Sequence, residues 1–273
     1  MSDLNDYLTT PLSKAAQGSS GAQAIERAFA ILRFVAGTGK LGARLSDVVA
    51  HTGLAQPTVH RMLRTLENEG AVLRSLEGKR YVIGPELTLL GLSTGLRELR
   101  SVASPFLERL CTEVGDAVFM SIASGRETVC ADRRIGSYPI QVLSIDIGSR
   151  RPLGVSVNGI AILSRLDPEK TQHIIDANTE RFGDFNIPKR LVEERVEQAR
   201  LRGYVYVEAA LVRNTRAVSV PVVSIAGTPI AAISTIAITR RIPTQRVSNL
   251  VSLLRTTADN ISHSIQEASK RRR

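Results

Sequence analysis

The stretch GLAQPTVHRMLRTLENEGAVLR, residues 53–74, constrains the fold more than any other part of this chain. Four apolar side chains fall on one side of a helix, at the i, i+3, i+4, i+7 spacing of a core-facing stripe: Val59, Met62, Leu63 and Leu66. Four polar side chains occupy the other side: His60, Arg61, Arg64 and Asn68. Such a face is either simply solvated or binds an anionic partner, such as DNA with its base-pair edges. The neighbouring elements of the sequence must distinguish these two possibilities.

A second short helix is predicted directly before this one. It opens at Ser46, whose hydroxyl is expected to cap the first turn while Leu45 and Ala50 close over it, and it stops at Thr52–Gly53. Two short helices joined by a tight turn that contains glycine, with the second polar outward, form a helix-turn-helix.

A β-hairpin is predicted next, from short β-prone runs at Ala71–Arg74 and Arg80–Ile83 around a Glu77–Lys79 tip. A basic hairpin that follows an outward-polar helix is the wing of a winged helix-turn-helix. Between Ala22 and Gly84 there are nine Lys or Arg against five Asp or Glu, an excess that contributes to attraction by a phosphate backbone.

The whole chain is globular in composition and basic. It has 273 residues, 43% of them hydrophobic, and a formal net charge of +10, part of which sits in the terminal residues 270–273. Two cysteines, Cys111 and Cys130, make neither a disulfide framework nor a metal site. Because no apolar signal core or membrane span is visible, a soluble protein of the reducing cytoplasm is expected.

An enzyme is the alternative class, in the form of a metabolite-converting α/β enzyme with an appended DNA-binding domain. Gly37, Gly39 and Gly42 satisfy G-x-G-x-x-G, but they follow a predicted helix where a dinucleotide site needs a strand, which favours an inter-helix loop. The four histidines lie too far apart in sequence to suggest a metal: His51, His60, His173 and His263. Neither a catalytic residue, a cofactor nor a metal site is predicted.

The run LSDVVAHTGLAQPTVHRMLRTLENEGAVLR followed by GKRYVIGPELTLLG resembles the N-terminal domain of the IclR family of bacterial transcriptional regulators. IGSRRPLGVSVNGIAILSRLDPE, RGYVYVE, VSVPV and PIAAISTIAI resemble later segments of the same family. The resemblance implies an α+β protein with a winged helix-turn-helix, a linker helix and a GAF-like α/β domain that binds a small organic effector. It also implies a homodimer or homotetramer on a palindromic DNA operator.

The expected domains are a flexible arm (1–21), the winged helix-turn-helix (22–84), a linker helix (85–101), the effector-binding domain (102–268) and a basic tail (269–273). The residue pattern of the second half predicts a mostly antiparallel sheet packed with helices. The predicted strands are Ala117–Ile122, Thr128–Asp132, Ile140–Ile145, Ala217–Val223 and Pro229–Ala237. The predicted helices are Val102–Val114, Asn158–Leu166, Pro168–Asn178, Pro188–Arg202 and a last one from about Thr244.

The DNA-binding residues follow from placing the second helix in the major groove. Expected DNA contacts come from Ser46, Gln56, Thr58, His60, Arg61, Arg64, Lys79 and Arg80, of which Gln56, Thr58, His60 and Arg61 reach base edges. Lys79 and Arg80, on the wing, are expected at the backbone or the minor groove. Pro57 stands where family members often carry a small polar residue, and since proline cannot donate, a hydroxyl contact made there is lost.

The resemblance also points to an effector site. Its residues are Asn158, Gly159, Ile160, Val207, Glu208, Ala217, Ser219, Ser234 and Ile236. Backbone N–H groups at the helix start by Gly159 would receive a carboxylate. Ile160, Val207 and Ala217 stand where many members have Lys, an acidic residue and Cys, which favours an aromatic or longer-chain acid over a very small polar one. Close packing of helix and sheet is an equally good explanation for any single one of these residues.

Overall fold

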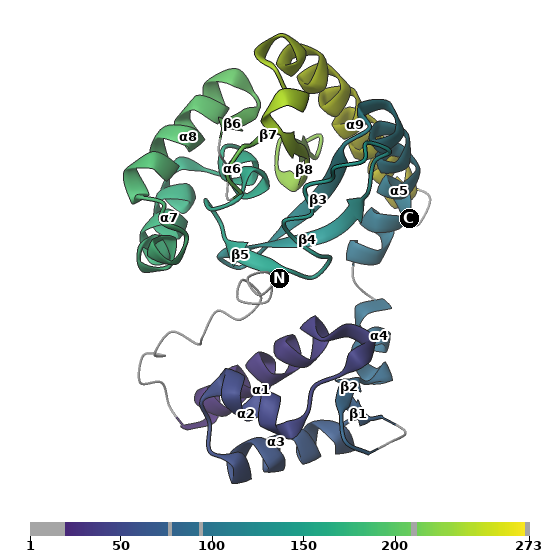
Figure 1. Ribbon diagram of the computed structural model, residues 1–273, viewed down its shortest axis with the longest axis vertical. Coiled ribbons are helices and arrows are strands. Elements are labelled where there is room, and N and C mark those ends of the chain that lie inside the picture. The colour runs from purple at the N-terminus through teal and green to yellow at the C-terminus, as the bar shows by residue number, and fades with distance from the viewer. Residues whose placement is uncertain (1–19, 76–77, 93–94, 209–211, 271–273) are drawn as a thin grey trace. The chain divides into compact units, whose positions relative to one another are not determined.

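The computed structural model describes residues 20–75, 78–92, 95–208 and 212–270 (Figure 1). It divides into two compact units, Met1–Arg97 and Glu98–Arg273. Most of the predicted arm, the predicted wing tip at Glu77 and the last three residues of the predicted tail lie outside the described residues. Among the helices that are described, none is long and apolar enough to cross a membrane.

The first unit is a winged helix-turn-helix, as the sequence predicts. Its elements are α1 (Ser20–Gly37), α2 (Leu45–Thr52), α3 (Gln56–Asn68) and the antiparallel hairpin of β1 (Val72–Arg74) and β2 (Tyr81–Ile83). One core holds them together: Ile31, Val35, Ala43, Val48, Val59, Leu63, Val72 and Tyr81. The predicted apolar stripe of α3 is thus its buried face, because Val59 and Leu63 are fully buried while Met62 and Leu66 pack at the edge of the same core.

The start of α2 differs from the prediction. The residue before the helix is Arg44, and its backbone N–H donates to Oδ2 of Asp47 at 2.8 Å. Ser46 lies inside the first turn and is exposed, and its hydroxyl donates to Oδ1 of Asp47 at 3.3 Å. The prediction that Ser46 caps the helix is therefore wrong, because the helix begins at Leu45 and Arg44 holds the capping position.

Two helices follow the hairpin, α4 (Pro85–Leu92) and α5 (Gly95–Val114). The sequence predicts a linker helix that ends near residue 101 and a separate helix from Val102, but α5 is continuous across that point. Its buried positions recur every three or four residues through the predicted break: Leu99, Ala103, Leu107, Leu110, Cys111 and Val114.

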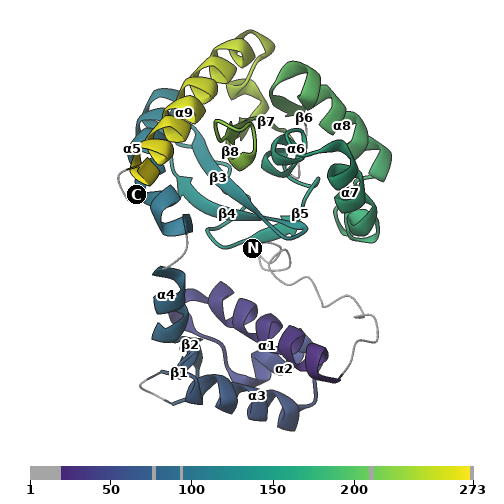
Figure 2. The same cartoon turned by 180° about the vertical axis from the view of Figure 1, so that it is seen from behind.

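The second unit is built on one antiparallel sheet of six strands, in the order β5-β4-β3-β8-β7-β6. The strands are β3 (Ala117–Ser124), β4 (Glu127–Arg134), β5 (Arg150–Pro152), β6 (Val205–Glu208), β7 (Thr215–Val223) and β8 (Pro229–Ile238). On one face lie α6 (Val157–Leu163), α7 (Pro168–Phe182) and α8 (Lys189–Arg202), while α5 and α9 (Thr244–Lys270) cover the other (Figures 1 and 2).

One predicted strand is absent from the sheet. Ile140–Ile145 belongs to an irregular segment, residues 135–149, which joins β4 to β5. The side chain of Gln141 holds this segment, since its Nε2 donates to the carbonyl of Gly115 at 3.2 Å and to that of Tyr138 at 2.5 Å. The edge strand beside β4 is instead Arg150–Pro152, which pairs with Glu127–Val129.

Candidate DNA interface and ligand site

The polar face of α3 is presented to solvent by the packing of its other face. Gln56, His60, Arg61 and Arg64 are all exposed, and Thr58 is half-buried. Because Val59 and Leu63 are fully buried, the helix is fixed in rotation about its axis, so the exposed side chains point outward together. Pro57 is the second residue of the helix, where its missing N–H leaves no intrahelical bond unmade.

The two basic residues of the wing have different surroundings. Lys79 is exposed, whereas Arg80 is half-buried and its Nη1 donates to the carbonyl of Gly42 at 2.9 Å. The neighbouring backbone is paired too, since Ala43 and Tyr81 exchange two hydrogen bonds of 2.9 and 2.7 Å. Arg80 therefore supports the base of the wing.

Gly42, the last glycine of GTGKLG, is explained by this packing. Its φ is +67°, and a Cβ built on it would lie 2.8 Å from the carbonyl oxygen of Tyr81. Both the backbone angle and the contact require glycine. The GxGxxG pattern is therefore a turn between α1 and α2 that receives the wing, and it does not follow a strand as a dinucleotide site requires.

In the second unit, the start of α6 is closed by its own residues. The backbone N–H of Gly159 donates to Oγ of Ser156 at 3.1 Å, and that of Ile160 donates to the Ser156 carbonyl at 3.0 Å. The expectation that the N–H groups beside Gly159 are open to a carboxylate is thus wrong for both residues. A serine at the N-cap, three residues before Gly159, takes the donor first.

Asn158 ties α6 to the sheet. Its Nδ2 donates to Oγ of Ser121 on β3 at 2.9 Å, and its Oδ1 accepts from Oγ of Ser219 on β7 at 2.7 Å. All three side chains are buried. These hydrogen bonds connect α6 to β3 and β7. Asn158 and Ser219 therefore have a structural role at the contact between α6 and the sheet.

The other predicted effector residues divide between the two faces of the sheet. Val207, Ala217, Ser219, Ser234 and Ile236 share the α6 face, because they are cross-strand partners or alternate along a strand. Val207 and Ala217 are packed into the core beneath α6, and Oγ of Ser234 is buried with no hydrogen-bond partner. Glu208 is one residue beyond Val207 and points away from this face, exposed and paired with Arg216 at 2.7 Å.

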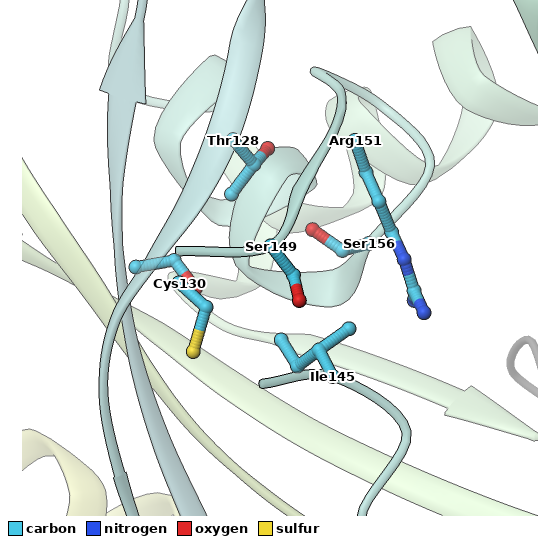
Figure 3. Close-up of a pocket in the computed structure, with 7 residues that line it drawn as sticks. Thr128, Cys130, Ile145, Ser149, Arg151 and Ser156 are labelled. Atoms are coloured by element: carbon cyan, nitrogen blue, oxygen red, sulfur yellow. The ribbon is translucent and has the colours of Figure 1, made fainter. Parts of the chain in front are cut away.

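A small cavity lies nearby, between β4, β5 and the start of α6 (Figure 3). Its volume is about 10 Å³, at the limit of what a single water molecule needs. The lining residues are Ser121, Thr128, Cys130, Ile145, Ser149, Arg151 and Ser156. None of the nine predicted effector residues lines it, although Gly159 adjoins it through Thr128 and Ser156.

The cavity combines a cation, hydroxyls and an apolar wall. Thr128 is 4% exposed, and its Oγ1 has no hydrogen-bond partner. Nη2 of Arg151 donates to the carbonyl of Ser144, in the segment that covers the cavity, at 2.8 Å. Burial raises the pKa of the Cys130 thiol to about 12, so that side chain is neutral at physiological pH and adds to the apolar wall beside Ile145. Sequence reasoning missed these residues because they meet only through the pairing of β4 with β5 and the path of residues 135–149.

The strand β5 is held in place by a half-buried carboxylate. Glu127 accepts from Nε of Arg150 and from Nη2 of Arg181, on α7, at 2.6 Å each. Burial alone would raise the pKa of Glu127, but hydrogen bonds from the two guanidinium groups outweigh it and lower the pKa. This clamp joins β4, β5 and α7 beside the cavity.

Most of the chain is similar to known proteins. A family model for the IclR helix-turn-helix domain matches residues 24–75, and one for the bacterial transcriptional regulator IclR C-terminal region matches residues 93–263. The chain belongs to the IclR family of bacterial transcriptional regulators. It is a DNA-binding regulator and not an enzyme, so the α/β enzyme alternative is set aside. Within the described residues, no group of three His, Cys, Asp or Glu side chains is arranged to hold a metal ion.

Relatives and solved structures agree with this membership. The glycerol operon regulatory protein of Streptomyces coelicolor is 32% identical over 67% of this chain and 71% of its own. The HTH-type transcriptional repressor AllR of Klebsiella pneumoniae is 29% identical over 92% of this chain and 93% of its own. An IclR homologue from Microbacterium hydrocarbonoxydans, solved with 4-hydroxybenzoate, has the same fold, with a TM-score of 0.72 and 22% identity over 89% of this chain and 99% of its own.

Proposed function

We propose that this IclR-family regulator binds a palindromic operator as a homodimer or homotetramer, and that a small organic acid bound by its second unit controls operator affinity. The observation that carries the DNA part is the exposed polar face of α3 over a fully buried Val59 and Leu63. The regulated genes would be a catabolic operon, with the protein acting as a repressor in the cytoplasm.

In this proposal α3 enters the major groove of the operator. Gln56, Thr58, His60 and Arg61 contact base edges, and Arg64 contacts a base or a phosphate. Ser46 and Lys79 contact the phosphate backbone or the minor groove from either side of α3. Arg80 has a smaller part, because one of its guanidinium nitrogens already donates to Gly42.

The effector is proposed to be an aromatic or medium-chain carboxylate. The wall formed by Ile145 and Cys130 favours a partly apolar ligand over glyoxylate or pyruvate, while Ile160, Val207 and Ala217 lie in the neighbouring core and keep its surroundings apolar. The 4-hydroxybenzoate bound by the Microbacterium homologue is an acid of this class. An acid that binds one conformation of the protein more tightly than the other would change the free energy of operator binding by that difference in binding free energy. Such couplings are commonly about 1–3 kcal/mol.

Footprinting on the intergenic DNA that flanks the gene tests the central proposal. We expect protection of a site with two-fold symmetry at low salt, and a steep loss of affinity as salt is added, because several phosphates are neutralised together. Random duplex DNA of equal length is the control. Absence of protection at low salt, both without and with 4-hydroxybenzoate, benzoate and octanoate, would refute operator binding.

Thermal unfolding with the same acids tests the effector proposal separately. Benzoate, 4-hydroxybenzoate or octanoate should raise the melting temperature more than glyoxylate or pyruvate at equal concentration, because a ligand that binds only the folded state stabilises it. A larger shift with glyoxylate than with every apolar acid would contradict the proposed ligand class while leaving operator binding untouched.

A further inference from the structure

The cavity beside α6 has two polar anchors of different chemistry, and they lie opposite each other in the sheet. Thr128 on β4 and Arg151 on β5 are direct cross-strand partners. Opposed residues of an antiparallel pair project from the same face. Both side chains line the cavity, and Figure 3 shows them on either side of Ser149 and Ser156.

We infer that Arg151 binds the carboxylate of the effector and that the Thr128 hydroxyl binds a second polar group, so that the ligand is an aromatic or medium-chain acid that also carries a hydroxyl or oxo group. This inference rests on the proposed function, because it assumes that the second unit binds an organic acid. It assigns the carboxylate to a side-chain cation, since the N–H groups of Gly159 and Ile160 already donate to Ser156.

The buried hydroxyl of Thr128 is the first observation that points to a ligand. It is 4% exposed, borders the cavity and has no hydrogen-bond partner, an unfavourable state for a buried polar group. A ligand hydroxyl or carbonyl would complete its hydrogen bonds. Oγ of Ser156 is already an acceptor for the N–H of Gly159, so Thr128 is the hydroxyl whose bonding is incomplete.

The two consecutive arginines of β5 have different roles, which is the second observation. Arg150 is committed to structure, since its Nε donates to Glu127 at 2.6 Å and its Nη2 to Ser124 at 3.0 Å. Arg151 points to the other face of the strand, where it lines the cavity. A guanidinium group is suited to a carboxylate because its N–H groups match the two oxygens.

Arg151 also connects ligand binding to the segment that covers the cavity. Its Nη2 donates to the carbonyl of Ser144, and at about 10 Å³ the cavity must widen before it admits an acid. A carboxylate that binds Arg151 competes with the Ser144 carbonyl for the same donor. Binding would therefore shift residues 135–149, whose apolar residues Ile140 and Ile147 are about half exposed.

Affinity measurements on the full-length protein, with probes that differ in one group at a time, test the inference. The probes are 4-hydroxybenzoate, benzoate, which lacks the hydroxyl, and 4-hydroxybenzamide, which lacks the charge. The wild type should bind 4-hydroxybenzoate about tenfold more tightly than either of the other two.

Two variants separate the two anchors. Arg151→Gln should reduce affinity for both acids by about tenfold or more and leave 4-hydroxybenzamide nearly unchanged, while Arg151→Lys should recover part of the loss. Thr128→Val, which replaces the hydroxyl by a methyl of similar size, should bind the two acids equally. Arg190→Gln is the charge-matched control on α8, where Arg190 is paired only with Glu194 among the described residues, and should bind as the wild type does.

The outcomes separate this inference from the proposed function. If the wild type binds the acids and both variants bind them with wild-type affinity and selectivity, the carboxylate is held elsewhere and the inference is wrong. If the wild type binds neither acid at millimolar concentration, the proposed effector class fails as well. A melting temperature close to that of the wild type shows that each variant is folded, and if Arg151→Gln does not fold, the loss of hydroxyl selectivity in Thr128→Val decides.

Discussion

Gly159 and Thr128 approach so closely that a Cβ built on Gly159 would lie 2.5 Å from Oγ1 of Thr128. Space alone requires this glycine, because it lies within α6 at an ordinary helical φ. The contact lets α6 approach β4 and leaves the hydroxyl of Thr128 at the edge of the cavity. Gly159, which the sequence analysis predicted in the effector site, is thus in close contact with Thr128, which the sequence analysis missed.

Gly159→Ala should destabilise the second unit by about 1–3 kcal/mol through overpacking, even though alanine by itself favours a helix by about 1 kcal/mol. Thr128→Ala in the same chain should recover part of that loss, because it removes the nearest atom. Urea unfolding of the four members of this cycle measures the coupling. The matched control is Gly183→Ala, since a Cβ at Gly183 meets nothing within 4 Å. Equal losses in the presence and absence of the Thr128 hydroxyl would contradict the steric explanation.

Arg61→Ala should weaken operator binding by about 1–3 kcal/mol and relax the sequence preference, if its guanidinium group binds a guanine. Lys79→Ala should weaken operator and random DNA alike, because a phosphate contact carries no sequence information. Both side chains are exposed, so stability should not change. Titration of each variant with operator and random duplexes measures the two affinities. If Arg61→Ala lowered the affinity for both duplexes equally, Arg61 would contact a phosphate and not a base.

The first unit could be predicted well because its signals are local. Val59, Met62, Leu63 and Leu66 repeat at the helical period, and all four pack into the core of that unit. The same approach failed at Ile140–Ile145, where an apolar run predicts a strand in isolation. The conformation of these residues depends on the pairing of β4 with β5 and on the hydrogen bonds of the Gln141 side chain. A local sequence pattern reveals neither of them.

The ligand site was less accessible to sequence reasoning. The family resemblance led to Gly159 and Ile160, but the cap formed by Ser156 occupies their N–H groups. Glu208 lies on the other face of the sheet from Val207, because successive residues of a strand alternate. Arg151 lines the cavity only because β5 pairs with β4 in a particular register, and register is a property of the folded sheet.

Glu127→Gln should make the second unit less sensitive to acid. The pKa of Glu127 is lowered below its ordinary value of 4.5, so its clamp with Arg150 and Arg181 stabilises the fold above that pH. The stabilisation is lost as the pH falls from that ordinary value through the lowered one, because over this interval the unfolded chain binds a proton that the folded carboxylate does not. Melting temperatures between pH 6 and pH 3 should fall less steeply in the variant, and its stability at pH 6 should be lower than that of the wild type. Glu197→Gln, at a mostly exposed position on α8, is the control.

His51 should make the first unit sensitive to mild acid. Its ring stacks on Phe34, with centroids 4.3 Å apart and an interplanar angle of 15°, and burial lowers its pKa below the ordinary value of 6.5. Above pH 6.5 the ring is neutral in both folded and unfolded chains. As the pH falls below 6.5 the unfolded chain binds a proton more readily than the folded one, so stability decreases.

His51→Phe should remove this pH dependence because phenylalanine keeps the stacked ring and has no titratable group. Hydrogen exchange of peptides from α1 and α2, compared with the wild type at each pH between 7.5 and 5, isolates the first unit from the second. We expect the variant to be relatively better protected as the pH decreases, and His60→Gln, at an exposed position of α3, to follow the wild type. A constant difference in protection between the wild type and His51→Phe across this range would show that His51 does not titrate as its burial predicts.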